Sequence, residues 1–420
     1  MNRIYKIVWS KAKNAYVVTS ELAKNHTKSA SGKAVKAALA AAVGMGLLMG
    51  GYTASAADNT PGAGDGVAIG TGSNAPKAEN VAVGKGATIK YSNGASAATG
   101  DVAVGSDAVI DNYASQGGSI AIGKNAKIEN MTGKQESLFA LGQTTYHSGN
   151  FWGTLQIPDN PENVAGSIAI GDNTYARTGS IMIGSHNYRG DIGDQSVDTS
   201  KTKDYGVNIN ATTLGTNSFN QGAFSTVSGA YSIISGKYDG SGFSSHAGQN
   251  FGATITGSLN SIESATASSR YSGVANSIVG TANRTFNSNG SLIFGAGNEI
   301  TNSITNISAP SGNSTSAKDL ADKLRASVKS SNSGGATLAI GGGNTADWTQ
   351  LSQIIGVNNT LKGTSGAISK FNMIDGYKNT VTKVEHVSVI GSEKPCLCYR
   401  RRKYRFTRNE CYNQRLSEYR

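Results

Sequence analysis

The sequence predicts an all-β protein built from short, stacked, repeating coils, and three observations lead to this fold class. The 420 residues include 54 glycines but only 7% aromatic and 15% charged residues, which favours β-structure with many tight turns. The apolar residues arrive as short pulses, and many of the pulses fit one unit, apolar-x-apolar-Gly. The glycines follow no every-third-residue pattern and a disordered chain would carry more charge, so collagen and disorder are excluded.

Residues 1–57 are expected to be an export signal that lies outside this repeat. An apolar stretch over residues 37–50 follows two lysines and precedes a run of small residues. This arrangement is typical of a secretory signal peptide, with cleavage after Ala56 or Ala57. An uncleaved membrane anchor is the alternative, although the stretch is short for a bilayer span.

More than thirty residues precede the apolar stretch, and their sequence is distinctive. The opening MNRIYKIVWSKAKNAYVVTSELAKNHTKS closely resembles the extended signal peptide region of type V secretion (autotransporter) proteins. The matching positions include Asn2, Ile4, Tyr5, Lys6, Trp9, Ala12, Val17, Ser20, Glu21 and Ala23. The resemblance implies export across two membranes. No cysteine occurs before residue 396, so the exported body is expected to rely on stacking and oligomerisation instead of disulfides.

The repeat unit defines two segments, a regular one over 58–184 and a degenerate one over 185–393. Neighbouring well-formed units lie 13 to 15 residues apart, and wider gaps indicate inserted loops. The clearest units have turn glycines at Gly70, Gly84, Gly105, Gly123, Gly171 and Gly184. Looser copies have turn glycines at Gly142, Gly215, Gly229, Gly236, Gly257, Gly280, Gly295, Gly341, Gly356, Gly376 and Gly391.

Each part of the unit has a structural role. The first and third residues of a three-residue strand share a face, so we expect the Val/Ile pairs to enter the core and the middle alanine to face outward. The glycine that follows permits positive φ at a corner. The asparagine of G-x-x-N then closes the turn and forms a ladder with its neighbours. The predicted ladder contains Asn187, Asn260, Asn283, Asn298, Asn344, Asn359 and Asn379.

The repeat strongly resembles the head of trimeric autotransporter adhesins of the YadA-like family, whose heads carry S-[VI]-A-[VI]-G repeats. The resemblance implies a left-handed parallel β-roll, a homotrimer without cofactors, and display on the bacterial surface. The implied partners are a host extracellular-matrix protein, a cell-surface glycan or receptor, or other bacteria. In some members the repeat surface itself binds collagen. Here the corresponding positions would be the alanines expected to face outward, Ala68, Ala82, Ala103, Ala121 and Ala169.

Two inserts stand out from the repeat. The insert between Gly142 and Ile168 contains Tyr146, Phe151 and Trp152, which are candidate binding anchors on a loop held by a rigid scaffold. Alternatively, these rings pack back onto the roll or across a trimer. Residues 316–329 have the spacing of a short amphipathic helix, which is expected to pack on the side of the coils.

No pattern of catalytic, metal or nucleic-acid chemistry emerges. The five histidines are scattered, the C-x-C at Cys396 and Cys398 lacks further ligands at usable spacing, and no nucleophile elbow or phosphate loop stands out. The segment 58–393 has a net charge of −3, so no nucleic-acid partner is expected. The alternatives are a secreted β-helical polysaccharide-active enzyme, which would need larger coils, and an ice-binding repeat, which would need regular Thr-x-Thr rows.

The last segment, 394–420, differs sharply in composition. It contains all three cysteines and has a net charge of +7. A complete member of the family continues into coiled-coil stalks and a β-barrel anchor, and no heptads follow here. A change of reading frame is the favoured explanation, and a genuine basic tail is the other. On the first explanation the chain is a truncated head, secreted or periplasmic, that would touch a membrane only through a missing anchor.

Overall fold

A computed structural model describes sixteen segments of the chain, which divides into two units, Met1–Ala57 and Asp58–Arg420. The described residues are 5–10, 15–20, 60–91, 99–112, 117–130, 135–136, 146–147, 150–151, 155–156, 166–177, 179–187, 210–235, 249–263, 272–310, 317–331 and 336–397. In the first unit, β1 (Tyr5–Ser10) and β2 (Ala15–Ser20) form an antiparallel hairpin.

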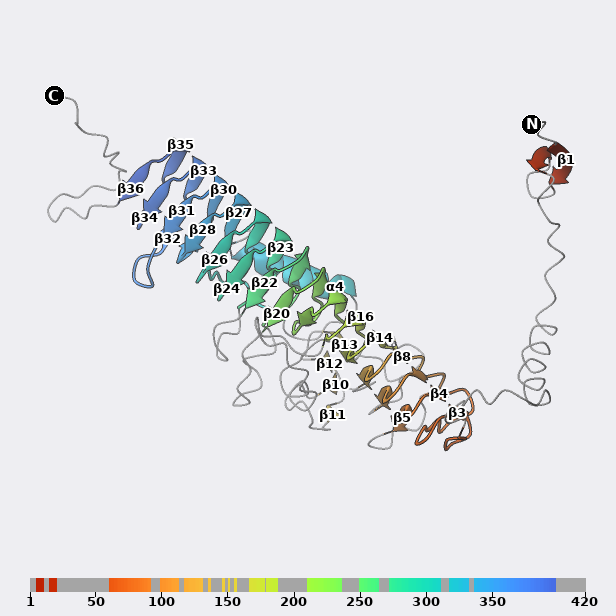
Figure 1. The fold of residues 1–420 in the computed structure, drawn as a ribbon. Helices are drawn as coiled ribbons and strands as arrows, with labels where there is room; N and C mark the ends of the chain where they lie inside the picture. The colour runs from red at the N-terminus through yellow and green to blue at the C-terminus, as the bar shows by residue number, and fades with distance from the viewer. Residues whose placement is uncertain are drawn as a thin grey trace, which may run out of the picture. The chain divides into compact units, whose positions relative to one another are not determined.

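The second unit is a parallel β-solenoid, as predicted, and one sheet of fifteen strands runs along it (Figure 1). All of its strand pairs are parallel, and each strand belongs to a different coil. Its strands, in order, are β3 (Val67–Ile69), β4 (Val81–Val83), β6 (Val102–Val104), β8 (Ile120–Ile122), β14 (Ile168–Ile170), β16 (Ile181–Ser185), β17 (Thr212–Thr216), β19 (Thr226–Ser228), β21 (Thr254–Thr256), β23 (Ser277–Thr281), β25 (Leu292–Ala296), β27 (Thr337–Gly342), β30 (Ser352–Val357), β33 (Met373–Tyr377) and β35 (Ser388–Ser392).

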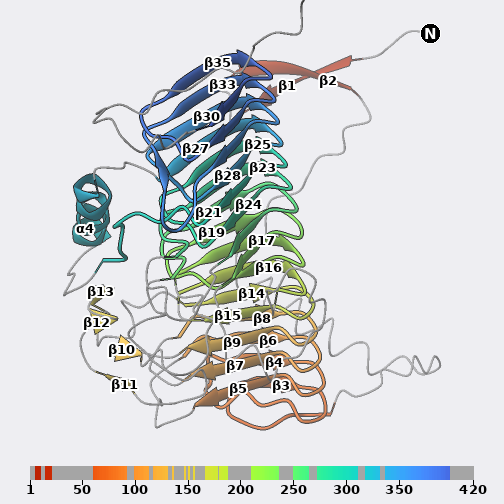
Figure 2. The same cartoon turned by 90° about the vertical axis from the view of Figure 1, so that its left-hand side faces the viewer.

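Two further parallel sheets form the second side of the coils (Figure 2). The four-stranded sheet contains β5 (Thr88–Tyr91), β7 (Val109–Asn112), β9 (Lys127–Asn130) and β15 (Tyr175–Arg177). The nine-stranded sheet contains β18 (Phe219–Asn220), β20 (Ile233–Ser235), β22 (Ser261–Glu263), β24 (Arg284–Phe286), β26 (Glu299–Thr301), β28 (Thr345–Asp347), β31 (Thr360–Lys362), β34 (Thr380–Thr382) and β36 (Pro395–Leu397). The paired coils therefore reach Leu397, four residues beyond the predicted end of the repeats at residue 393.

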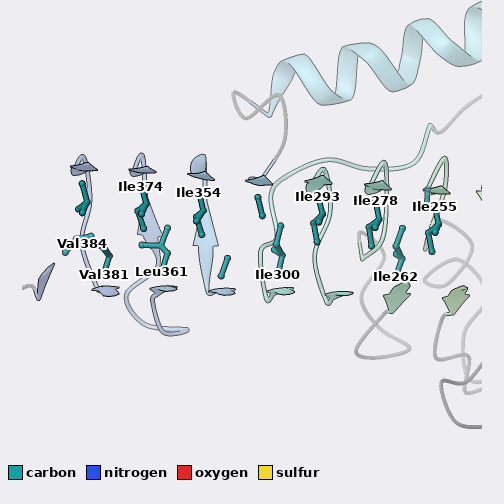
Figure 3. Close-up of a cluster of buried hydrophobic side chains, with 14 of the residues drawn as sticks. Ile255, Ile262, Ile278, Ile293, Ile300, Ile354, Leu361, Ile374, Val381 and Val384 are labelled. Atoms are coloured by element: carbon teal, nitrogen blue, oxygen red, sulfur yellow. The ribbon is translucent and has the colours of Figure 1, made fainter. Parts of the chain in front are cut away.

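The core is a double column of side chains, one from each strand of a coil. In one coil Ala103 and Ile110 are both fully buried, and in another Ile255 and Ile262 are. The two residues lie seven positions apart in sequence, and Figure 3 shows the two rows facing each other along the stack. In the first coils an alanine in one column is matched by an isoleucine in the other, as Ala103 is by Ile110, whereas later coils pair two large side chains, as Ile255 with Ile262.

The prediction of which strand residues enter the core is wrong. The middle residue of each strand is buried, whereas the flanking Val/Ile residues face outward: Ala121 is 0% exposed and Ile122 is 38% exposed. All three residues of a Val-Ala-Val strand are apolar, so alternation alone does not identify the inner face. The narrow coil has room for a single side chain per strand, and the middle position supplies it.

The corner after each turn glycine is closed, as predicted. The six turn glycines of the clearest units, and those of the looser copies from Gly280 to Gly391, have φ between 112° and 145°. Consecutive glycines approach so closely that a Cβ on Gly280 would lie 1.8 Å from the carbonyl oxygen of Gly295. In each of the four-stranded and nine-stranded sheets, every strand begins four residues after such a glycine. The corner therefore has one length throughout the described coils.

The predicted asparagine ladder is present at this corner. The Asn298 amide nitrogen donates to the Asn283 side-chain oxygen at 3.0 Å and to the Gly341 carbonyl oxygen at 2.8 Å. The Asn298 backbone N–H donates to the same Asn283 oxygen at 3.0 Å. The pattern repeats in neighbouring coils at Asn260, Asn283, Asn344, Asn359 and Asn379. The buried amides thus find their partners in the coils on both sides, which fixes the coil-to-coil register.

The opposite corner, between the second strand of one coil and the first strand of the next, varies in length. It has 5 residues between β24 and β25, 10 between β31 and β33, and 35 between β26 and β27. The last of these contains helix α4 (Ala317–Ser330). The insert between β9 and β14 contains two hairpins, β10 (Gln135–Glu136) with β11 (Tyr146–His147) and β12 (Asn150–Phe151) with β13 (Leu155–Gln156). A third pair, β29 (Thr349–Gln350) with β32 (Ser369–Lys370), is parallel. We call the corner between the second strand of one coil and the first strand of the next the open corner.

Adding a side chain at the closed corner should destabilise the stack. We expect Gly295→Ala to lower the free energy of unfolding by about 3 kcal/mol or more, because the new Cβ meets the Gly341 carbonyl oxygen at 1.8 Å and φ is +139°. Gly366→Ala is the control, since nothing lies within 4 Å of its Cβ position. Urea denaturation followed by circular dichroism measures both variants, and equal midpoints would contradict the steric argument.

The two corners should differ in their tolerance of inserted residues. Residues 364–368 form an excursion at the open corner of one coil. In the next coil the equivalent point of the chain lies between Lys383 and Val384, without such an excursion. A second copy of this pentapeptide placed between Lys383 and Val384 should leave the circular dichroism spectrum and melting midpoint nearly unchanged. The same five residues placed between Tyr377 and Lys378 should interrupt the ladder and lower the midpoint strongly. Similar midpoints for the two insertions would show that the closed corner is not special.

Candidate functional site

The face most unlike an ordinary protein surface is the outer face of the fifteen-stranded sheet. In each coil the first and third residues of the apolar-x-apolar-Gly unit flank the buried middle residue and point outward there. We call the columns that these residues form the first and third flanking rows, after their position in the unit. In β3, Val67 is 50% and Ile69 is 41% exposed, and in β25 Phe294 is 43% exposed. Other exposed apolar residues of the rows are Ile122, Ile183, Leu214, Val279, Ile340 and Ile390. The rows are apolar throughout β3 to β16, and polar residues interrupt them further along the sheet. So much exposed apolar surface on a chain with mean hydropathy −0.29 is typical of an interaction site.

The outer face of the nine-stranded sheet is polar by contrast. Threonines occupy its outward first positions in three consecutive strands, Thr345, Thr360 and Thr380. Earlier in the sheet, Arg284 of β24 pairs with Glu263 of β22 at 2.8 Å and with Glu299 of β26 at 2.7 Å. The hydrogen bonds that Arg284 donates to the Glu263 carboxylate are the main cause that holds the pKa of the guanidinium above its ordinary value. This sheet presents the polar groups expected of a surface that faces water.

The alanines predicted to form an outward binding surface lie inside the coils. Ala82, Ala103, Ala121 and Ala169 are 0% exposed, and Ala68 packs against the buried cluster of the first coils. Their expected outward orientation is therefore wrong, because each is the single inward residue of its strand. The outward surface of the same strands is made by the Val/Ile neighbours, which the sequence had suggested as core residues.

The predicted aromatic anchors can be placed only by backbone. Tyr146 lies in β11 and Phe151 in β12, within the hairpins of the insert that leaves the open corner after β9. Trp152 and the cleavage-site residues Ala56 and Ala57 fall outside the described residues. The role of these positions stays a prediction.

The predicted helix is confirmed, and it packs on the side of the coils. α4 spans Ala317–Ser330, one residue displaced from the predicted range 316–329. Leu320, Leu324 and Val328 contact a small apolar cluster that includes Phe251 and Ile307 from the loops of the open corner. Its polar side carries pairs between residues three or four apart, such as Lys318 with Asp322. The helix therefore covers a local enlargement of the core.

Among the described residues, no cluster of three or more His, Cys, Asp or Glu side chains is arranged to hold a metal ion. Cys396 is buried in the core column and is disulfide-bonded. In the described part of the chain, no helix has the length and hydrophobicity needed to cross a membrane.

A buried carboxyl group, that of Asp101, belongs to a second ladder of polar side chains. This ladder lies directly before the apolar-x-apolar-Gly unit, and its only signal in the sequence is the Ser or Asn that often occupies that position. Asp101 is 0% exposed and accepts hydrogen bonds from the Ser119 backbone N–H at 2.9 Å and the Asn112 amide at 2.8 Å. Its own N–H donates to the Asn80 side-chain oxygen at 3.1 Å. Burial raises the pKa of Asp101 to about 6, and the two accepted hydrogen bonds oppose that rise.

Comparisons with known proteins bear on the beginning of the chain. Residues 1–50 match the family described as the Extended Signal Peptide of Type V secretion system. These residues are similar to the export signals of that secretion system. A segment of 40 residues is 58% identical to the autotransporter adhesin NhhA of Neisseria meningitidis serogroup B. That segment is 10% of this chain and 7% of the relative, and no solved structure matches the chain. The first 50 residues are thus similar to type V export signals, as predicted, and the matched 40 residues are similar to an autotransporter adhesin.

The buried Asp101 should make the first coils less stable at neutral pH than at mildly acidic pH. Its folded pKa of about 6 lies above the unfolded value of about 4, so the folded state retains a proton that the unfolded state loses. The free energy of unfolding should therefore fall by up to about 3 kcal/mol as the pH rises from about 4 to 6.

Asp101→Asn should remove this dependence and raise stability at pH 7, because asparagine already occupies the equivalent ladder position at Asn80. Urea denaturation of both proteins at pH 4.5 and pH 7 tests this. Asp107→Asn, at an exposed corner of the same coil, is the control for loss of one charge. An unchanged pH profile in Asp101→Asn would rule out this carboxyl as the cause.

Proposed function

We propose that residues 58–393 form the head of a bacterial surface adhesin, and that the chain acts as a homotrimer at the cell surface. The type V secretion signal supports export to that surface, and the adhesin relative supports the general function. The observation that carries the proposal is a rigid solenoid with one apolar and one polar outer face, preceded by that signal.

The homotrimer is supported by the flanking rows. From β3 to β16 every flanking position of the unit is valine or isoleucine, and several are more than one-third exposed in the single chain. Each such side chain would contribute about 1.5–3 kcal/mol if it were fully buried. Copies that meet on this face would bury a column of apolar residues along the stack and leave the polar sheet in water.

Ligand binding is then expected away from the flanking rows. The open corner admits long excursions, and the insert that contains Tyr146, Phe151 and Trp152 is one of them. We propose that these rings are anchors for a host extracellular-matrix protein, a cell-surface glycan or receptor, or another bacterium. A rigid scaffold that carries variable loops is a common arrangement for recognition.

Sedimentation of residues 58–420 tests the assembly. We expect a trimer, and we expect Ile122→Lys with Ile183→Lys to shift it towards monomer while the circular dichroism spectrum is retained, because both side chains are outward. Thr345→Lys with Thr360→Lys, on the polar sheet, should leave the trimer intact. A folded monomer in the unmodified chain would contradict the homotrimer.

Adhesion is tested separately with the purified trimer. Retention on immobilised collagen, on cultured epithelial cells or on other bacteria is the expected result, and Trp152→Ala should reduce it at least tenfold if the insert is the anchor. A trimer retained by none of these surfaces would argue against an adhesin.

A further inference from the structure

A group of hydroxyl side chains interrupts the apolar flanking rows. Strands β17, β19, β21 and β23 pair in register, so their first flanking residues form one column. These residues are Thr212, Thr226, Thr254 and Ser277, and the third flanking row adds Ser228 and Thr256. We call these six residues the hydroxyl band. The middle residues of β19, β21 and β23 are ordinary core residues, Val227, Ile255 and Ile278, whereas β17 also has a threonine, Thr213, at the buried middle position.

The hydroxyl groups of the band are not used by the chain itself. Within the described residues, none of the six side chains forms a hydrogen bond, and all lie half-buried or exposed on the outer face. Threonine and valine have nearly the same shape, and both suit a strand. Valine at these positions would therefore extend the apolar face without altering the coil. What the threonines add is a set of donors and acceptors directed at whatever covers this face.

From β3 to β16 the face gives little information about alignment, whereas beyond the band Gln353, Asp375 and Ser388 add further polar groups to the rows. The strands β3, β4, β6, β8, β14 and β16 all present a Val or Ile at both flanking positions. Two copies packed on such a surface would make similar contacts after a slip of one coil, which is about 4.8 Å. Uniform apolar interfaces specify register poorly, and in coiled coils one polar layer is enough to specify it.

We propose that the hydroxyl band sets the axial register of the copies in the assembled head. The inference rests on the proposed homotrimer, because the occupant of the face is a second copy of this chain. In register, equivalent threonines of the three copies meet, and each hydroxyl donates to one neighbour and accepts from the other. After a slip of one coil, Thr212 faces the layer of Ile181 and Ser277 faces the layer of Leu292. Hydroxyls at both ends of the band would then be buried without partners.

Cross-linking between copies tests the register. Ile122 and Ile170 are third flanking residues of adjacent coils and are paired in register within the chain. Residues 58–420 with Ile122→Cys and residues 58–420 with Ile170→Cys are co-expressed and oxidised, and linked peptides are identified by mass spectrometry. With the band intact, links between two copies of position 122 should exceed links between positions 122 and 170 at least tenfold.

The band variant is T212V/T226V/T254V in the same two chains. It should still assemble, while the ratio of in-register to slipped links falls at least threefold. The variant T212S/T226S/T254S keeps the hydroxyls and should keep the original ratio.

The matched control is T345V/T360V/T380V, which changes three threonines of the polar sheet and should also leave the ratio unchanged. An intact trimer whose band variant keeps the tenfold preference would overturn the register role alone. Loss of assembly in the band variant would overturn it too, because the band would then hold the copies together instead of aligning them. A monomeric unmodified chain would overturn the proposal together with the homotrimer.

Discussion

The structure depends on the contact between one coil and the next at the closed corner. There a glycine without a side chain lets two backbones approach, and an asparagine amide donates to the carbonyl oxygen of the next glycine, as Asn359 does to Gly376 at 2.8 Å. Any other residue at the glycine would separate the coils, and an apolar residue at the asparagine would leave buried backbone groups without partners. The constant length of this corner and the in-register strands both follow from this contact.

The core follows from the same register. Because the coils are aligned, the middle residues of successive strands stack directly on one another, and a layer needs only two side chains to fill it. One coil buries too little to be stable alone, so stability comes from the interfaces between neighbouring coils. Variation is then confined to positions that do not touch those interfaces, namely the open corner and the outward residues. The long excursions and α4 occupy the open corner.

Much of this could be predicted from the sequence, because the repeat imposes a period that local chemistry explains. The glycine corners, the asparagine ladder and α4 were all predicted, the last from the spacing of Leu320, Leu324 and Val328. The inward face was not, since a strand such as Val-Ala-Val is apolar on both sides and only the width of the coil decides which side is buried. The apolar face was missed for the same reason. Asp101 lies at a position where serine or asparagine is usual, and its burial depends on the coils above and below it.

The orientation of the hydrogen bonds has a mechanical consequence. Strands run across the stack, so the backbone bonds between coils and the bonds of the asparagine ladder point along its axis. A pulling force applied along that axis would load the interfaces between coils one after another, as links in a chain, and would not shear many of them together. The force that such a stack withstands is therefore set by its weakest interface, and adding coils lengthens the molecule without strengthening it.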